Sequence, residues 1–197
     1  NGIMALNSCN VHVYQNTLIN SSVGFNRDGR SAVGDHFGWH PATGPDVKER
    51  IGHVFVNNIL YADKDYKKPL MSLWQPAALC DSIKESPLKQ MDYNVYIKDS
   101  KNNFRQLMLW SPAKEKNCQQ AIELLVDMQK LFAGSSANSK VIIDKNLAIF
   151  KSKELGNYQL SNNFGKSIKA LKLPLDIQKL LKLSANYSPY VGAYQPK

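Results

Sequence analysis

Cysteine is scarce in this chain of 197 residues, and the few that occur are poorly placed for a metal or disulfide scaffold. Cys9, Cys80 and Cys118 lie far apart and form no Cys-x-x-Cys pair. We therefore expect neither a structural zinc site nor a dense disulfide framework. One pair could still form a bridge, and the odd number leaves at least one thiol free.

Long apolar runs and polar low-complexity segments are also missing. Without an apolar stretch long enough to cross a bilayer, no membrane span is expected, and nothing in the composition indicates disorder. The hydrophobic content of 43% suffices for one buried core. The chain opens without a start methionine, a signal peptide or a capping element, so we interpret it as the C-terminal portion of a longer protein. Its missing N-terminal portion is then an expected partner.

Charged side chains are absent from residues 1–26, whereas residues 27–50 hold four basic and four acidic groups. The whole excess behind the formal net charge of +9 follows Ile51, where the lysines are spread singly or in pairs. A nucleic-acid groove would need a concentrated basic stripe with aromatic residues. We therefore expect no nucleic acid as a partner, whereas an acidic polysaccharide or oligosaccharide suits the charge.

A repeat is present in the first third of the chain. Residues 11–19 align without a gap with residues 52–60, which pairs Asn16 with Asn57 and a histidine with a histidine. Asparagine tolerates the left-handed backbone of a tight bend, and stacked copies can hydrogen-bond to each other. The two stretches are therefore predicted to lie directly on top of each other.

This repeat resembles that of the right-handed parallel β-helix family of pectate-lyase-like proteins, which reads Gly-Ile-x-x-x-Asn-Ser-x-Asn-Val-x-Val-x-x-Asn-x-Ile. The likeness runs over residues 1–61. As stacked equivalents, His12 and His53 are expected to face outward from their strands. Asn16 and Asn57 are expected to be ladder residues without a catalytic role.

The resemblance implies an all-β fold, a right-handed parallel β-helix (solenoid) with a C-terminal helical and irregular cap. The coils are expected over residues 1–110, with a long loop at 27–50, and the cap with its closing strands over residues 111–197. Within the cap, the apolar side of residues 117–132 and the stop at Gly134 predict one main helix. The resemblance also implies a carbohydrate-active protein of bacterial origin that is secreted, periplasmic or on the cell surface.

Residues 27–50 interrupt the repeat, and long loops of this kind often carry function. A lyase acting on a uronic acid needs a base, a cation for the growing negative charge and an acid for the leaving oxygen. Arginine, lysine and histidine can fill all three positions. The catalytic candidates are Arg30, His36, His40, Lys48 and Arg50. The substrate-binding candidates are Trp39, as a platform for a sugar ring, with Arg27, Asp28 and Asp35.

A polysaccharide lyase acting on an acidic glycan is therefore the leading expectation. The first alternative is a glycoside hydrolase on the same fold, which would use two carboxylates across the scissile bond. Those carboxylates would come from Asp28, Asp35, Asp46 and Glu49. The second alternative is a non-catalytic glycan-binding or cell-surface structural protein, in which the loop only shields the coils.

A metal is not expected in this loop. His36 and His40 are four residues apart, but Gly38 and Pro41 oppose the helix that would turn them into a pair of metal ligands. Calcium would need a denser acidic group than Asp28, Asp35 and Asp46 supply. The sequence therefore predicts no metal and no cofactor.

Overall fold

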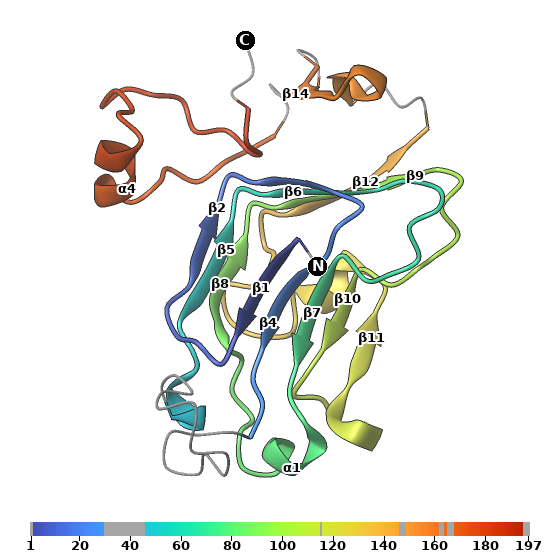
Figure 1. Ribbon diagram of the computed structural model, residues 1–197, viewed down its shortest axis with the longest axis vertical. Coiled ribbons are helices and arrows are strands. Elements are labelled where there is room, and N and C mark those ends of the chain that lie inside the picture. Colours follow the sequence, from blue (N-terminus) through green and yellow to red (C-terminus); the bar gives the residue numbers. More distant parts are fainter. Residues whose placement is uncertain are drawn as a thin grey trace, which may run out of the picture.

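The structure is a computed structural model that describes residues 2–29, 46–114, 116–145, 149–161, 164 and 168–194 (Figure 1). The described strands form three larger sheets and one hairpin. Between β1 and β9 the chain visits the three sheets in the same order three times. This order brings segments that are far apart in sequence next to each other.

Each larger sheet collects strands from successive parts of the chain. The five-stranded sheet contains β1 (Ile3–Leu6), β4 (Val23–Asn26), β7 (Met71–Trp74), β10 (Met108–Trp110) and β11 (Gln120–Ile122). The three-stranded sheet contains β2 (His12–Tyr14), β5 (His53–Val56) and β8 (Leu88–Asp92). The four-stranded sheet contains β3 (Thr17–Ile19), β6 (Ile59–Ala62), β9 (Val95–Asp99) and β12 (Lys140–Asp144). Neighbouring strands are parallel except for β10 and β11, which are antiparallel.

Short helices and a hairpin complete the fold. Among the described residues, the α-helices are α1 (Ala77–Cys80), α2 (Leu125–Met128) and α4 (Leu175–Leu180), and the 3-10 helices are η1 (Val47–Glu49), η2 (Lys116–Cys118) and η3 (Lys153–Leu155). The antiparallel hairpin consists of β13 (Phe150–Ser152) and β14 (Asn157–Leu160). None of the helices that the structure describes has the length and apolar character of a membrane span.

The predicted class, an all-β right-handed parallel β-helix, is wrong for this chain. The sheets mix parallel with antiparallel strands, several separate sheets occur, and helices are interspersed with the strands, as in an α/β-type fold. The sequence repeat reports only how neighbouring segments pair locally. It carries no information on the reversal of direction at β11 or on the hairpin β13–β14.

The predicted main helix over residues 117–132 is also wrong. Asn117 and Cys118 have φ angles of 65° and 60°, and the antiparallel strand β11 follows them. Left-handed backbone cannot continue a right-handed helix. The apolar residues of this stretch are therefore distributed over β11, the short helix α2 and the residues next to α2, such as Leu124 and Leu131.

Asparagine side chains connect the bends that lead into the four-stranded sheet. The Oδ1 atom of Asn58 accepts hydrogen bonds from the backbone N–H (2.9 Å) and the Nδ2 (3.1 Å) of Asn16. The Oδ1 atom of Asn94 accepts the same pair from Asn58, at 2.9 and 3.1 Å, and the Asn94 N–H donates to Ser139 Oγ at 3.1 Å. Asn58 and Asn94 are fully buried, so this asparagine ladder satisfies amides that burial would otherwise leave unpaired.

The asparagine ladder has a register one residue away from the predicted one. Asn16 stacks on Asn58 and not on Asn57, and the strands on either side pair with the same offset. A shift of one residue moves every side chain of a strand to the opposite face. His53, predicted to face outward, is therefore buried, and its ring centroid lies 5.2 Å from that of Phe25.

Asn57 instead holds the C-terminal segment, residues 168–194. Its backbone has a φ angle of 61°. Its side chain donates to the carbonyl of Leu171 at 2.7 Å and accepts from the Leu171 N–H at 2.9 Å. Its own carbonyl accepts from the Gly192 N–H at 2.8 Å. Figure 1 shows this segment and the hairpin lying over the four-stranded sheet.

The apolar residues form two clusters, one on each face of the four-stranded sheet. The main core lies between the three sheets and contains Phe25, Phe55 and Met91. On the outer face, residues such as Tyr61 pack against Phe150 of the hairpin. The strands β6 and β9 are therefore buried along their whole length, which explains their nearly unbroken apolar sequence.

A disulfide between Cys80 and Cys118 joins α1 to η2, and Cys9 is free. The hydroxyl of Ser111 donates to the carbonyl of Cys118 at 2.7 Å. The disulfide therefore connects two loops at the end of the five-stranded sheet.

Replacing Asn58 by alanine is expected to lower the free energy of unfolding by about 2–4 kcal/mol, because the backbone N–H of Asn16 loses its acceptor and the Oδ1 of Asn94 loses one of its two donors. Asn103→Ala, at an exposed position, is the matched control and should change this free energy by less than about 0.5 kcal/mol. Urea unfolding followed by circular dichroism measures both. Equal stability of the two variants would contradict a structural role for the ladder.

Candidate functional site

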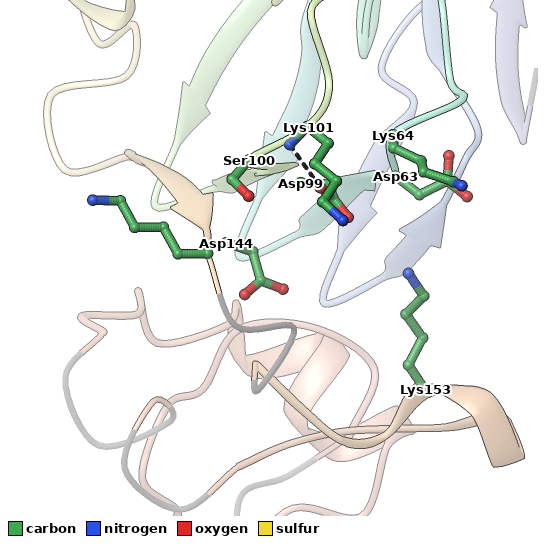
Figure 2. Close-up of a pocket in the computed structure, with 8 residues that line it drawn as sticks. Asp63, Lys64, Asp99, Ser100, Lys101, Asp144 and Lys153 are labelled. Carbon is green, nitrogen blue, oxygen red and sulfur yellow. Dashed lines mark hydrogen bonds between the residues drawn. The ribbon is translucent and has the colours of Figure 1, made fainter.

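Three aspartates lie side by side where strands of the four-stranded sheet end. Asp99 and Asp144 are the last residues of β9 and β12 and are directly paired in register. Asp63 follows β6, whose last residue, Ala62, pairs with Lys98. Because parallel strands end at the same edge of a sheet, this register places the three carboxylates in one row. Figure 2 shows the three side chains among the residues that line a pocket at these strand ends.

Lysines surround the three carboxylates and complete a pocket of about 400 Å³. A lysine follows one or two residues after each aspartate in the sequence, and a fourth lysine, Lys153, is the first residue of η3, which follows β13. The lysines of the pocket are Lys64, Lys101, Lys145 and Lys153, and Ser100 also lines it. We call this the Asp–Lys pocket.

Asp63 is fixed by hydrogen bonds to its carboxylate. The amide of Asn20 donates to Oδ2 at 2.6 Å, and the backbone N–H groups of Asp65 and Tyr66 donate to Oδ1 at 2.9 and 3.1 Å. Burial alone raises the pKa of Asp63, but these hydrogen bonds and the charge of Lys153 outweigh it, so the pKa is lowered. The carboxylate is therefore ionised at neutral pH.

Asp99 and Asp144 are more deeply placed, with exposed fractions of 8% and 5%. Oδ1 of Asp99 accepts a hydrogen bond from the backbone N–H of Lys101 at 2.8 Å, which closes the bend after β9. The aspartates thus have a local role, since Asp63 and Asp99 each stabilise the turn after their strand. Their alignment across the sheet is what gathers the three charges.

Lys153 reaches the pocket from the hairpin side, toward the strand ends that carry the aspartates (Figure 2). Its Nζ donates to the hydroxyl of Tyr61 at 3.2 Å and lies 4.5 Å from the centroid of that ring, a cation–π contact. The pKa of Tyr61 is raised by burial and then by the charges of Asp144, Asp99 and Asp63. The phenol of Tyr61 therefore stays protonated next to these three aspartates.

This arrangement can bind a ligand that carries both hydroxyl and acidic groups. Ionised carboxylates accept hydrogen bonds from hydroxyls, and ammonium groups bind anions. Within the ranges that the structure describes, no group of three or more histidine, cysteine, aspartate or glutamate side chains is placed to hold a metal ion.

The predicted catalytic and binding residues that the structure describes, Arg27, Asp28, Lys48 and Arg50, do not line the Asp–Lys pocket. Lys48 is exposed on η1. Arg50 is almost fully buried. Its Nη1 atom donates to Asn7 Oδ1 at 2.8 Å and to the carbonyl of Asp28 at 2.9 Å. The same atom lies 3.7 Å from Asp28 Oδ1. The structure thus brings Arg50 and Asp28 together in a network with Asn7. The catalytic and binding roles assigned to them stay predictions.

Arg27 is also buried, with Nε donating to Gln75 Oε1 at 2.6 Å and Nη2 donating to the carbonyl of Glu85. Burial lowers the pKa of Arg27 to about 10, partly offset by the charge of Glu85. The guanidinium therefore keeps its proton at neutral pH. The remaining predicted residues, Arg30, Asp35, His36, Trp39 and His40, lie outside the described residues.

The sequence did contain a signal for the Asp–Lys pocket. Each of three triplets begins at the last residue of a largely apolar strand or directly after it: Asp63-Lys64-Asp65, Asp99-Ser100-Lys101 and Asp144-Lys145-Asn146. In the sequence the lysines are spread singly or in pairs, and the unequal spacing of the triplets conceals their equivalence. Aligning the residues that follow each apolar run would have revealed the row of aspartates.

The chain matches no protein-family model, and no characterised protein and no solved structure matches it. A function must therefore be argued from the geometry and chemistry of the residues themselves.

His53 gives the region around Arg27 a pH-dependent stability. Its Nδ1 accepts the Val11 N–H at 3.1 Å, and burial, Arg27 and His12 lower its pKa to about 4. The pKa of histidine in the unfolded chain is about 6.5. The contribution of His53 to the free energy of unfolding is therefore fully present above that pH and is lost as the pH falls toward 4.

Unfolding in urea at pH 7.5 and 4.5 should show that His53 accounts for a loss of about 2–3 kcal/mol between the two values. His53→Asn keeps an acceptor for Val11 and should remove that part of the loss. His12→Asn removes one imidazole at an exposed position and should remove only a smaller part of the loss, because His12 is the weakest of the three causes that lower the pKa of His53. An acid loss that is the same in both variants would contradict this assignment.

Proposed function

We propose that this protein binds an acidic oligosaccharide in the Asp–Lys pocket. The observation that carries the proposal is the in-register row of Asp63, Asp99 and Asp144 with lysines around it. Sugar hydroxyls would donate to the carboxylates, and the carboxylate of a uronic acid residue would bind Lys101 or Lys153. A neutral sugar could not form an ion pair with the lysines, and a simple anion would lack the hydroxyls that donate to the aspartates.

The size and the overall charge support this choice of ligand. A volume of about 400 Å³ lies within the range of about 300–1,000 Å³ that is usual for small-ligand pockets. The net charge of +9 raises the local concentration of a polyanion around the protein. The disulfide Cys80–Cys118 supports the further proposal that the protein works outside the cytosol, as a secreted, periplasmic or cell-surface protein.

Cleavage of the bound glycan is the second candidate function. Asp99 and Asp144 are paired on adjacent strands, and neighbouring strands lie about 4.8 Å apart. That spacing is close to the roughly 5–5.5 Å between the two carboxyl groups of retaining glycoside hydrolases. A polysaccharide lyase would instead use a lysine to hold the uronate carboxylate and would need a separate base. An unsaturated product distinguishes the lyase, and new reducing ends without it distinguish the hydrolase.

Calorimetric titration with tetragalacturonate tests binding at the Asp–Lys pocket. Lys101→Gln and Lys153→Gln should each weaken the affinity by about tenfold, which corresponds to about 1.4 kcal/mol. The affinity should also fall as salt is added, because exposed charges are screened. Lys179→Gln, an exposed lysine on α4, is the matched control and should bind like the unaltered protein.

Two results would contradict the proposal. One is the absence of heat with tetragalacturonate and with other uronate oligosaccharides at low salt. The other is an equal loss of affinity in Lys179→Gln and in the two pocket variants, which would indicate non-specific attraction to positive charge.

A further inference from the structure

A second hollow, of about 570 Å³, lies on the three-stranded sheet and is lined by residues of β2, β5 and β8. Figure 1 shows these three strands side by side. The register pairs His12 with Val54, and Val54 with Gln90, so these side chains form a row on one face. Tyr14 lies two residues after His12 and therefore points to the same side. The hollow thus has a face built by strand alternation.

Two aromatic rings stand on this face. The ring centroids of His12 and Tyr14 are 6.0 Å apart, and the ring planes meet at 73°. His12 is exposed and Tyr14 half-buried, whereas Val13 between them is buried in the main core. Burial and the charge of Asp176 raise the pKa of Tyr14, so its hydroxyl is protonated and can donate a hydrogen bond.

The rim of the hollow supplies hydrogen-bonding groups with little charge. Asn10 and Gln90 carry amides, and Lys89 carries an ammonium group. Among the described residues that line the hollow, Lys89, His12 and Tyr14 are the ionisable ones, and none is a carboxylate. This chemistry differs from that of the Asp–Lys pocket.

Gly52 leaves space in the hollow because it has no side chain. Gly52 has a φ angle of 83°, and a Cβ atom there would meet Asn10 Oδ1 at 2.3 Å. Any other residue would therefore be strained and would displace the Asn10 amide.

We infer that this hollow binds a neutral sugar residue whose ring stacks on Tyr14. The apolar C–H face of a sugar would lie against the aromatic ring, and its hydroxyls would bond to the amides of Asn10 and Gln90. The hollow and its occupant do not depend on the Asp–Lys pocket, because stacking and amide bonding need no charge. The inference therefore holds for a neutral oligosaccharide alone.

Amide chemical-shift mapping of the ¹⁵N-labelled protein tests the inference with three neutral probes: cellotetraose, galactotetraose and xylotetraose. At least one probe should shift the amide signals of Gly52, Val54 and Gln90 in a saturable way. Tyr14→Ala should weaken that binding by about tenfold. Tyr14→Phe keeps the ring and should bind within about threefold of the unaltered protein.

Two controls keep this test separate from that of the acidic site. Tyr194→Ala removes a half-exposed tyrosine outside the hollow and should leave the shifts intact. Asp99→Asn with Asp144→Asn alters the Asp–Lys pocket and should leave them intact as well. Absence of shifts at the hollow with all three probes would overturn the inference, as would shifts that persist in a folded Tyr14→Ala variant.

Discussion

The parallel register that runs through the asparagine ladder is the constraint on which the rest of this structure depends. Asn58 receives two hydrogen bonds from Asn16 and gives two to Asn94, so each bend is held directly against the next. The strands that follow these bends therefore start level with each other. Because they run in the same direction, they also end level, and Asp63, Asp99 and Asp144 meet at that end.

The same aspartates serve the turns and the pocket. Asp63 and Asp99 accept backbone N–H groups of the turns that follow them, which is a common local use of aspartate. Because the strands are stacked in register, these local residues form one shared negative surface. Lys153 approaches this surface from the hairpin. The proposed ligand site is thus a consequence of turn chemistry repeated in register, whereas the second hollow arises from side-chain alternation on the paired strands β2, β5 and β8.

Sequence reasoning found the local pairing but not the whole fold. Residues 11–19 and 52–60 do lie side by side. Asn57 and Asn58 are adjacent, and the sequence does not show which of them belongs to the ladder. Only the contacts show that Asn58 is the ladder residue and that Asn57 binds Leu171. The reversal at β11 and the helices, which overturn the all-β class, depend on long-range contacts that a repeat does not encode. The predicted site residues come from the loop at 27–50, whereas the pocket follows from the register.

Cysteine cross-linking at the strand ends tests the register most directly, in a Cys9→Ser background. Paired positions on adjacent parallel strands lie about 4.8 Å apart, within the range of roughly 4.4–6.8 Å that a disulfide spans. Asp99→Cys with Asp144→Cys should therefore form a new disulfide on mild oxidation. Asp99→Cys with Ile143→Cys should not, because Ile143 points to the opposite face. Faster bridging of the second pair, or none in the first, would contradict the account.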